Sequence, residues 1–359
     1  MLGALRNYLS PERGSTPVFD GVLRPNQELD LCRLLARHLG GADDIAVVDG
    51  EPVVSCGSRL LRVSGHWFAP LVSTIAEFDG IAGAIAATDH GLAVAVDGNR
   101  IVFSGGLHNG RVLAAAAGSR FSCITALAAH GNRLVVAEGS KTNGTAGWRR
   151  DLMEQGASGR VVEIDLASGR ESVLAEGLAW ASGVAFAPDG SLVVSESWRH
   201  RVRSLSGGKG SFDDIPAYPG RIAASPGGGY WLSCFATRTQ LVDFVVADRR
   251  LAGRMMKEID EEFWIAPTLA ATDHPHEPTQ LGGVKYYGAR KPWAPARSYG
   301  LVIKLGSDLV PTASLHSRVD GKRHGITGVA CDGERAFFVS KGNGKLMQHD
   351  IPRALEAAR

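Results

Sequence analysis

Short β-type runs, each long enough for one strand and each followed by a tight turn, recur along this chain and limit what it can fold into. The pattern is clearest in residues 148–205, where VVEIDL, ESVLAEG, GVAFAP, SLVVSE and RVRSLS alternate with Ala-Ser-Gly, Pro-Asp-Gly and Trp-Arg-His. The runs have strand length, and the residues between them are those that turns need. Since no helix separates the runs, they predict antiparallel hairpins in one small sheet.

From Asp44 onward, an apolar run, a polar turn and further apolar runs occur six times. The copies are IAVVDGEPVVSCGSRLLRV, IAGAIAATDHGLAVAVDGNRIVFSGG, ITALAAHGNRLVVAEG (outer strands in GRVVEIDLASGRESVLAEG), GVAFAPDGSLVVSESWRHRVRSLS, GRIAASPGGGYWLSCF and RHGITGVACDGERAFFVSKGNGKLMQHDI. Each first run is rich in small apolar residues, as crowded inner strands around an axis require. Four-stranded sheets packed radially leave only short edges. The sequence therefore predicts an all-β fold, a six-bladed β-propeller.

The predicted organisation is a lead-in of residues 1–40 packed on one propeller domain of residues 41–359. MLGALRNYL predicts a short helix, while DLCRLLARHLGG fits either an amphipathic helix or an outer strand. SKTNGTAGWRRDLMEQGAS interrupts the third blade, and a longer insertion at about 248–298, helical in its first part, interrupts the fifth. A loop of that length is typical of a lid or binding element, with an oligomer contact as the alternative. The oligomeric state is not predicted.

Composition excludes two classes of partner. Lys and Arg number 39 against 37 Asp and Glu, so the formal charge of +2 gives no footprint for nucleic acid or for an anionic membrane. The first residues lack an apolar segment of signal-peptide length, and no run approaches the length of a membrane helix. Five scattered cysteines without a C-x-x-C pair indicate buried neutral thiols in a reducing compartment. We therefore expect a cytoplasmic protein with a small-molecule partner.

Several short motifs resemble those of the strictosidine synthase-like and gluconolactonase-like group of six-bladed propellers. They are Asp151-Leu152-Met153-Glu154, Gly159-Arg160, Gly177-Leu178, Gly183-Val184, Ala187-Pro188-Asp189-Gly190, Tyr218-Pro219 with Ile222 and Ser225-Pro226, and Phe19-Asp20-Gly21-Val22-Leu23 with Pro25-Asn26. The resemblance runs from about Phe19 to Ile351 and implies the same propeller fold. It implies less about function, because key residues of the family differ here.

The family's catalytic and metal-binding positions depart from the usual pattern. The resemblance places Thr327 where plant strictosidine synthases carry their catalytic Glu, and Thr is no general base near neutral pH. It places Asp43, Thr125, Ser182 and Gly220 where gluconolactonases and paraoxonases hold an axial divalent cation. Only Asp43 among these is a strong ligand for a hard cation. The expected cofactor is therefore none or one divalent cation (Ca²⁺, Mg²⁺ or Zn²⁺) held partly by Asp43.

The mouth of the propeller axis is the expected site, because the inner strands start around one pocket. The polar residues expected there are Asp43, Asp44, Thr125, Ser182, Arg221, His324 and Thr327. Arg221 predicts an anion clamp or, equally, a partner for Asp43 or Asp44 across the channel. His324 fits a general acid or base, with an exposed loop histidine as the alternative.

Aromatic and acidic residues around this mouth each have two interpretations. Trp148 and Trp180 line the pocket or simply pack. The insertion's aromatics roof an apolar ligand or form a small core of their own; they are Phe263, Trp264, Tyr286, Tyr287, Trp293 and Tyr299. The segment 273–277, DHPHE, is predicted to be a polar lid segment rather than a metal site. Glu138 and Glu196 end second strands and are predicted to form structural hydrogen bonds near the opposite face or the blade body.

The leading functional hypothesis is hydrolysis of a lactone or a related cyclic carbonyl compound. In it, Asp43 or His324 activates water, and Arg221 binds an anionic end of the substrate or stabilises the oxyanion. Thr125, Ser182 and Thr327 orient the carbonyl group, while Trp148, Trp180 and Trp264 contact the substrate. The alternatives are an enzyme that forms or breaks C–N or C–C bonds and a ligand-binding or scaffold propeller without catalysis.

Overall fold

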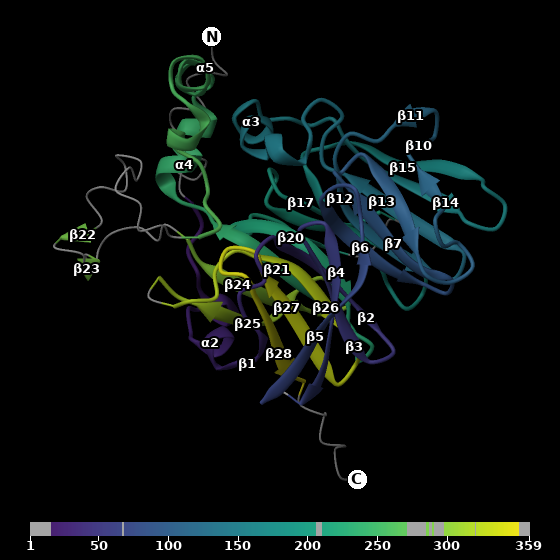
Figure 1. The fold of residues 1–359 in the computed structure, drawn as a ribbon. Coiled ribbons are helices and arrows are strands. Elements are labelled where there is room, and N and C mark those ends of the chain that lie inside the picture. The colour runs from purple at the N-terminus through teal and green to yellow at the C-terminus, as the bar shows by residue number, and fades with distance from the viewer. Residues whose placement is uncertain are drawn as a thin grey trace.

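Six four-stranded antiparallel sheets are arranged around one axis in the computed structural model of this chain (Figure 1). The structure describes residues 16–66, 68–205, 210–270, 285–286, 289–290, 298–319 and 321–351. The inner strands of the six sheets contact one another in a closed ring. The predicted all-β, six-bladed propeller is therefore confirmed.

The strands are given blade by blade, from the innermost strand outward. Blades one to three contain β2 (Ala42–Val48), β3 (Glu51–Cys56), β4 (Arg59–His66) and β5 (Ala69–Glu77); β6 (Ala82–Thr88), β7 (Gly91–Val96), β8 (Arg100–Ser104) and β9 (Val112–Leu113); and β12 (Ile124–His130), β13 (Arg133–Glu138), β14 (Gly159–Asp165) and β15 (Glu171–Leu178). Blades four to six contain β16 (Ala181–Phe186), β17 (Leu192–Glu196), β18 (Arg201–Ser204) and β19 (Ser211–Phe212); β20 (Ala217–Ala224), β21 (Tyr230–Thr237), β24 (Gly300–Leu305) and β25 (Pro311–Ser317); and β26 (Ile326–Cys331), β27 (Arg335–Ser340), β28 (Lys345–Asp350) and β1 (Arg33–Ala36).

The ring is closed by a strand that precedes the first blade in the sequence. β1 pairs with β28, so the lead-in supplies the outer strand of blade six. Two short helical turns, η2 (Gly21–Leu23) and α2 (Glu28–Leu31), come before it. Of the two alternatives for DLCRLLARHLGG, the outer strand therefore holds for Arg33–Ala36.

Both faces of a blade are buried, because each blade packs between two others. In β13, Leu134 and Val136 pack with blade two, whereas Val135 and Ala137 pack with blade four. Alternate residues of a strand point to opposite faces, so near-continuous apolar runs suit this position. The cysteines follow the same rule: Cys32, Cys56, Cys123 and Cys234 are buried and Cys331 is half-buried, all as free thiols.

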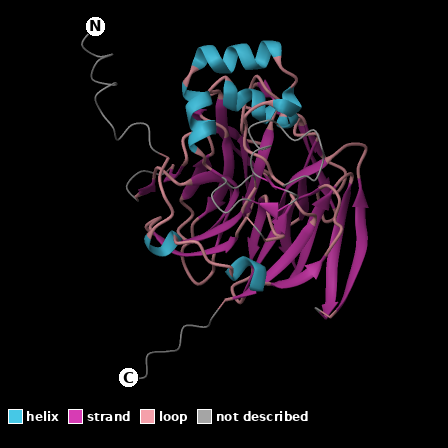
Figure 2. Ribbon diagram, turned by 90° about the vertical axis from the view of Figure 1, so that its left-hand side faces the viewer, coloured by secondary structure: helices cyan, strands magenta, loops and turns pink. Residues whose placement is uncertain are grey.

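The two predicted insertions carry the longer helices, which gather at one end of the molecule (Figure 2). Between β13 and β14 lie η3 (Thr145–Gly147) and α3 (Trp148–Met153). Between β21 and β24 lie α4 (Gln240–Ala247), α5 (Arg249–Glu258), η4 (Glu261–Phe263), β22 (Lys285–Tyr286) and β23 (Ala289–Arg290). This insertion begins before the predicted residue 248, because Thr239 caps α4 by accepting from the Val242 amide.

A small hairpin of β10 (Ala115–Ala116) and β11 (Ser119–Arg120) follows β9. None of the helices that the structure describes has the length and hydrophobicity needed to cross a bilayer.

Candidate functional site

A cavity of about 210 Å³ opens on the propeller axis beside α3. The inner strand of each blade contributes to its lining, with Asp43, Gly83, Thr125, Ser182, Arg221 and Thr327 in blades one to six, respectively. Each lies where the pairing register between the inner strand and the second strand of its blade shifts. Such bulges redirect a side chain away from the regular pleat. Six equivalent irregularities therefore bring residues of all six blades together on the axis, with side chains from every blade except blade two, which contributes Gly83.

Arg221 crosses this point and pairs with acidic residues of the first blade. Its Nη2 donates to Asp43 Oδ2 at 2.5 Å, and its Nε lies 3.2 Å from Asp44 Oδ2. It also donates to the backbone carbonyls of Asp43, Thr125 and Thr327, at 2.9, 3.0 and 3.3 Å. The predicted pairing of Arg221 with Asp43 and Asp44 is confirmed. The guanidinium is thus held by groups from three blades.

The two carboxylates differ in pKa. Burial alone would raise the pKa of Asp43, but the charges of Arg221 and Lys341 outweigh it and hold that pKa well below its usual range. Lys341 Nζ lies 2.6 Å from Asp43 Oδ1. Burial raises the pKa of Asp44 to about 6, because Arg221 and the Ile85 amide offset only part of the cost of burial. Asp43 is therefore the stronger acid of the two, and Asp44 is the carboxyl group whose pKa lies nearer to neutral pH.

The three predicted hydroxyl residues lie in the cavity wall and bond to backbone. Thr125 Oγ1 donates to the carbonyl groups of Ala137 and Ala181, Ser182 Oγ to that of Pro219, and Thr327 Oγ1 to that of Asp43. Their hydrogens connect strands of neighbouring blades, which leaves only their lone pairs for a ligand.

An aromatic wall forms one side of the cavity. It consists of Trp148, Trp180, Trp198 and Phe235. The rings of Trp180 and Trp198 stack with centroids 5.2 Å apart, and those of Trp148 and Trp198 with centroids 6.5 Å apart. Trp198 Nε1 donates to the buried Asp151 of α3, which ties the blade-three insertion to blade four. The wall therefore offers flat apolar faces in the same cavity as the charged cluster.

The backbone of Trp180 is strained where it enters this wall. Its φ of 56° lies in the left-handed region, which is costly for a bulky residue. Gly139 of blade three makes room for the ring: a methyl group there would come within 2.9 Å of Trp180 and of the Thr125 methyl. The strained backbone of Trp180 and the glycine that its ring requires at position 139 indicate that the position of this indole is tightly constrained.

Two predicted site residues lie elsewhere. His324 is buried and does not line the axial cavity: its Nδ1 pairs with Ser298 Oγ at 2.8 Å and its Nε2 with the Arg318 carbonyl at 2.7 Å. Its expected place in the pocket and the exposed-loop alternative are both wrong. Trp264 packs with Met255 and Val242 of the insertion, and Nε1 donates to the Ile259 carbonyl. It therefore belongs to a small core of the insertion rather than to the cavity wall.

The other aromatic residues of the insertion divide between the protein core and solvent. Tyr299 packs in the propeller core against Phe19, while Phe263 is exposed. The segment 273–277 and Tyr287 and Trp293 lie outside the described residues, as does the side chain of Tyr286.

Glu138 and Glu196 make structural ion pairs, as predicted. Glu138 pairs with Arg160 in the body of blade three, and Glu196 with three arginines of blade four, Arg199, Arg201 and Arg203. Of their two predicted places, the blade body is correct and the opposite face is not. Each residue pairs with the first residue of its inner strand, so both lie at the end of the blade where the cavity opens.

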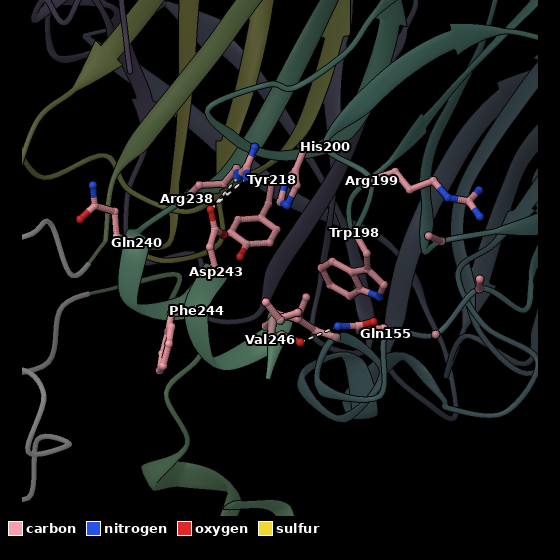
Figure 3. Close-up of a pocket in the computed structure, with 15 residues that line it drawn as sticks. Gln155, Trp198, Arg199, His200, Tyr218, Arg238, Gln240, Asp243, Phe244 and Val246 are labelled. Atoms are coloured by element: carbon pink, nitrogen blue, oxygen red, sulfur yellow. Dashed lines mark hydrogen bonds and ion pairs between the residues drawn. The ribbon is translucent and has the colours of Figure 1, made fainter. Parts of the chain in front are cut away.

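A second cavity of about 530 Å³ lies next to the first, between α3, α4 and blade four (Figure 3). Trp198 lines both cavities and separates them. Gln155 donates to the Val246 carbonyl across this space, and Arg238 pairs with Asp243, as the dashed lines show. The first of these bonds joins the two insertions, and the second ties α4 to the end of β21.

Comparison with known proteins agrees with this architecture. Adipocyte plasma membrane-associated protein from Salmo salar is 36% identical over 110 residues, which are 27% of this chain and 26% of that protein. The Mus musculus protein of the same name is 30% identical over 132 residues, 32% of each chain. The alignments thus span about a quarter to a third of these curated relatives. No sequence-family profile matches the chain.

Solved structures share the fold across most of the chain. A gluconolactonase from Xanthomonas campestris matches with a TM-score of 0.52 and 12% identity, covering 89% of both chains. The predicted family resemblance is confirmed. The PQQ-bound aldose sugar dehydrogenase of Streptomyces coelicolor matches equally well, with a TM-score of 0.52 and 14% identity over 88% of this chain and 96% of that one. Because the gluconolactonase-like fold also carries such different chemistry, the fold alone does not choose the reaction.

The axial residues do not fit the divalent cation that the gluconolactonase resemblance implies. Hard cations need six to eight oxygen ligands. Here the Arg221 guanidinium supplies the positive charge that pairs with Asp43 and Asp44. The ammonium group of Lys341 pairs with the other carboxylate oxygen of Asp43. Among the described residues, no three His, Cys, Asp or Glu side chains are placed to hold a metal ion. Asp43 is therefore a partner of two cationic side chains rather than a metal ligand.

Among the cavity residues that were not predicted from the sequence are Trp198, Phe235 and Lys341. Lys341 follows the end of β27, Trp198 follows β17 closely, and Phe235 lies near the end of β21. In an antiparallel pair, the end of the second strand lies beside the start of the inner strand. The residues that follow each second apolar run were therefore the signal that could have found them.

Proposed function

We propose that this chain is a small-molecule enzyme that hydrolyses a lactone or a related cyclic ester in its axial cavity. The observation that carries the proposal is the pair of Asp43 and Lys341, with Nζ and Oδ1 2.6 Å apart, in a cavity that tryptophans also line. A carboxylate can orient water, an ammonium group can stabilise an oxyanion, and a flat apolar face can hold a substrate ring. A gluconolactonase that shares the fold is compatible with this reaction class.

Lys341 is placed to stabilise the charge that develops on the substrate. Its side chain is 43% exposed, whereas that of Arg221 is 14% exposed and already makes several bonds to oxygen. When water adds to the carbonyl carbon, the carbonyl oxygen becomes an oxyanion, which a positioned ammonium group stabilises. The ring C–O bond then breaks, and the product is a hydroxy acid whose carboxylate Lys341 pairs with.

Asp43 orients the attacking water in this proposal. Because Arg221 and Lys341 hold its pKa far below neutral, Asp43 is a weak base and acts by accepting a hydrogen bond from the water. The water's proton passes to the leaving ring oxygen, so the atoms balance without a further reactant. Arg221 serves as the group that fixes Asp43.

The cavity favours a compact substrate with a flat or apolar body. Its volume of about 210 Å³ is below the roughly 300–1,000 Å³ common for ligand pockets. The stacked indoles of Trp180 and Trp198 suit a ring or a short alkyl chain.

Ligand binding without catalysis is the second candidate. It is favoured by the hydroxyl groups of Thr125, Ser182 and Thr327, whose hydrogens are all donated to backbone carbonyls. In that case the cavity would hold a small carboxylate on Lys341 and turn nothing over.

A panel of γ- and δ-lactones with alkyl or aryl substituents separates these candidates. We expect turnover by the wild-type protein, a fall in kcat/KM of about 10²-fold in K341M, as for loss of one oxyanion donor, and no change in K257M on the exposed face of α5. Binding of the hydroxy acids without turnover would favour the binding protein. Turnover that is equal in wild type and K341M would overturn the proposed mechanism.

We also infer a cytoplasmic location with no membrane or nucleic-acid partner. The balanced charge of the chain supports this inference. The curated relatives are named for association with a plasma membrane, so fractionation of cells that express the chain is the direct test.

A further inference from the structure

The guanidinium of Arg221 sits in a shell of oxygen atoms on the propeller axis. Two are carboxylate oxygens, from Asp43 and Asp44, and three are backbone carbonyl oxygens, from Asp43, Thr125 and Thr327. All five lie between 2.5 and 3.3 Å from a guanidinium nitrogen. Carboxylate and carbonyl oxygens of this kind, here supplied by three blades, are the ligands that a hard divalent cation uses.

The charges of this cluster balance only while Arg221 is present. Asp43 and Asp44 face Arg221, and Lys341 contacts Asp43 from the cavity side. Without the guanidinium, two largely buried carboxylates would share a single lysine. Buried charge that loses its partner is strongly destabilising unless another cation replaces it.

The strand bulges fix the backbone carbonyl oxygens, and each carboxylate has a partner besides Arg221: Lys341 for Asp43 and the Ile85 amide for Asp44. Asp43 and Asp44 lie in the bulge of β2, Thr125 in that of β12 and Thr327 in that of β26. Thr327 Oγ1 donates to the Asp43 carbonyl at 2.6 Å, which joins two of these strands directly. A change of Arg221 to a small residue should therefore leave the oxygen shell in place.

We propose that Arg221 is a built-in cation of the axial centre, and that its removal uncovers a latent binding site for a divalent cation such as Ca²⁺. The wild-type chain then needs no metal at its axis. This inference concerns cation binding, and it does not depend on the proposed reaction.

The test is a Ca²⁺ titration of wild type and R221A, read by thermal unfolding and by calorimetry. We expect the wild-type Tm to be unchanged by Ca²⁺, and the lower Tm of R221A to rise saturably with it. R221A should bind Ca²⁺ at least about 100-fold more tightly than wild type does, the difference between millimolar and ten-micromolar Kd.

Matched variants identify the ligands. R221A/D43N should lose the Ca²⁺ response, and R221M, which fills the space with an uncharged chain, should show little of it. R160A is the control for loss of a buried arginine, because Glu138 is the only carboxylate that pairs with Arg160 among the described residues.

Two results would overturn the proposal. One is stoichiometric Ca²⁺ binding by the wild-type protein. The other is a folded R221A that does not respond to Ca²⁺. If R221A does not fold, R221N replaces it, since its shorter amide adds an oxygen to the same shell; a folded R221N without a response is equally contrary.

Discussion

Two buried arginines, Arg160 and Arg221, both pair with carboxylates, one within a blade and the other beside the axial cavity. Arg160 lies in the body of blade three, where Nε donates to Glu138 at 2.5 Å and both side chains are almost completely enclosed (2% and 0% exposed). Arg221 meets two carboxylates on the axis, is 14% exposed and borders a cavity. Burial and pairing therefore do not distinguish a structural ion pair from a site. The difference is that the axial cluster includes Lys341, whose partly exposed ammonium group is accessible to a ligand in the cavity.

Substitution of either arginine should change the free energy of unfolding most, and the two losses should differ. R160M leaves Glu138 buried without a partner, so we expect a loss of about 3–5 kcal/mol in the free energy of unfolding. R221M should cost less, about 1–3 kcal/mol, because Lys341 still pairs with Asp43, which lines the cavity. Urea unfolding of both variants measures the difference. A larger loss in R221M than in R160M would contradict the distinction drawn between the two sites.

Glu196 of blade four and Asp44 on the axis should respond to pH in opposite directions. Burial would raise the pKa of Glu196, but the Ala179 amide and the arginines of blade four lower it. Its contribution is thus present above the ordinary pKa and lost as pH falls through the lowered one. The pKa of Asp44, which faces Arg221 and Asp43, is raised to about 6. Between about pH 4 and 6 the folded state therefore holds the extra proton, and stability falls as pH rises.

Amide substitutions separate these two effects. E196Q should lower the unfolding free energy at pH 7, with the difference shrinking below pH 4. D44N should raise it above pH 6, on the order of 1 kcal/mol, with the gain vanishing toward pH 4. The check is unfolding free energy measured from pH 4 to 8. The same sign for both variants would show that the axis and the blade are electrostatically alike.

Removal of Lys341 should have the smallest effect on stability. Its side chain is 43% exposed, and exposed ion pairs contribute about 0–1 kcal/mol. K341M should therefore unfold almost as wild type does, yet lose affinity for small carboxylates in calorimetry. Equal affinity in both proteins would mean that the charge facing the cavity binds no ligand.

The fold could be predicted from the sequence because it is repeated. Six copies of one hairpin pattern, with small residues in each first run, define inner strands around an axis, and the closed ring of β2, β6, β12, β16, β20 and β26 follows. The pairing of Arg221 with Asp43 and Asp44 was also accessible, because equivalent positions of inner strands must meet at the axis.

The rest of the site depends on geometry that residue types do not specify. His324 precedes β26, yet its ring turns away and is held by Ser298 and Arg318. Trp264 has the composition of a pocket wall, but the helices of the insertion enclose it in their own core. Lys341 and Trp198 were missed because the register of an antiparallel pair, not the sequence of either strand, places them beside Asp43 and Trp180.

The axis of this propeller carries its own cation in Arg221, beside a cavity that stays open to a small ligand. The most direct measurement is the metal content of wild type and R221A after equilibrium dialysis against Ca²⁺, by mass spectrometry of the metal. We expect far less than one Ca²⁺ per chain in wild type and close to one in R221A. One tightly held Ca²⁺ per wild-type chain would contradict this expectation.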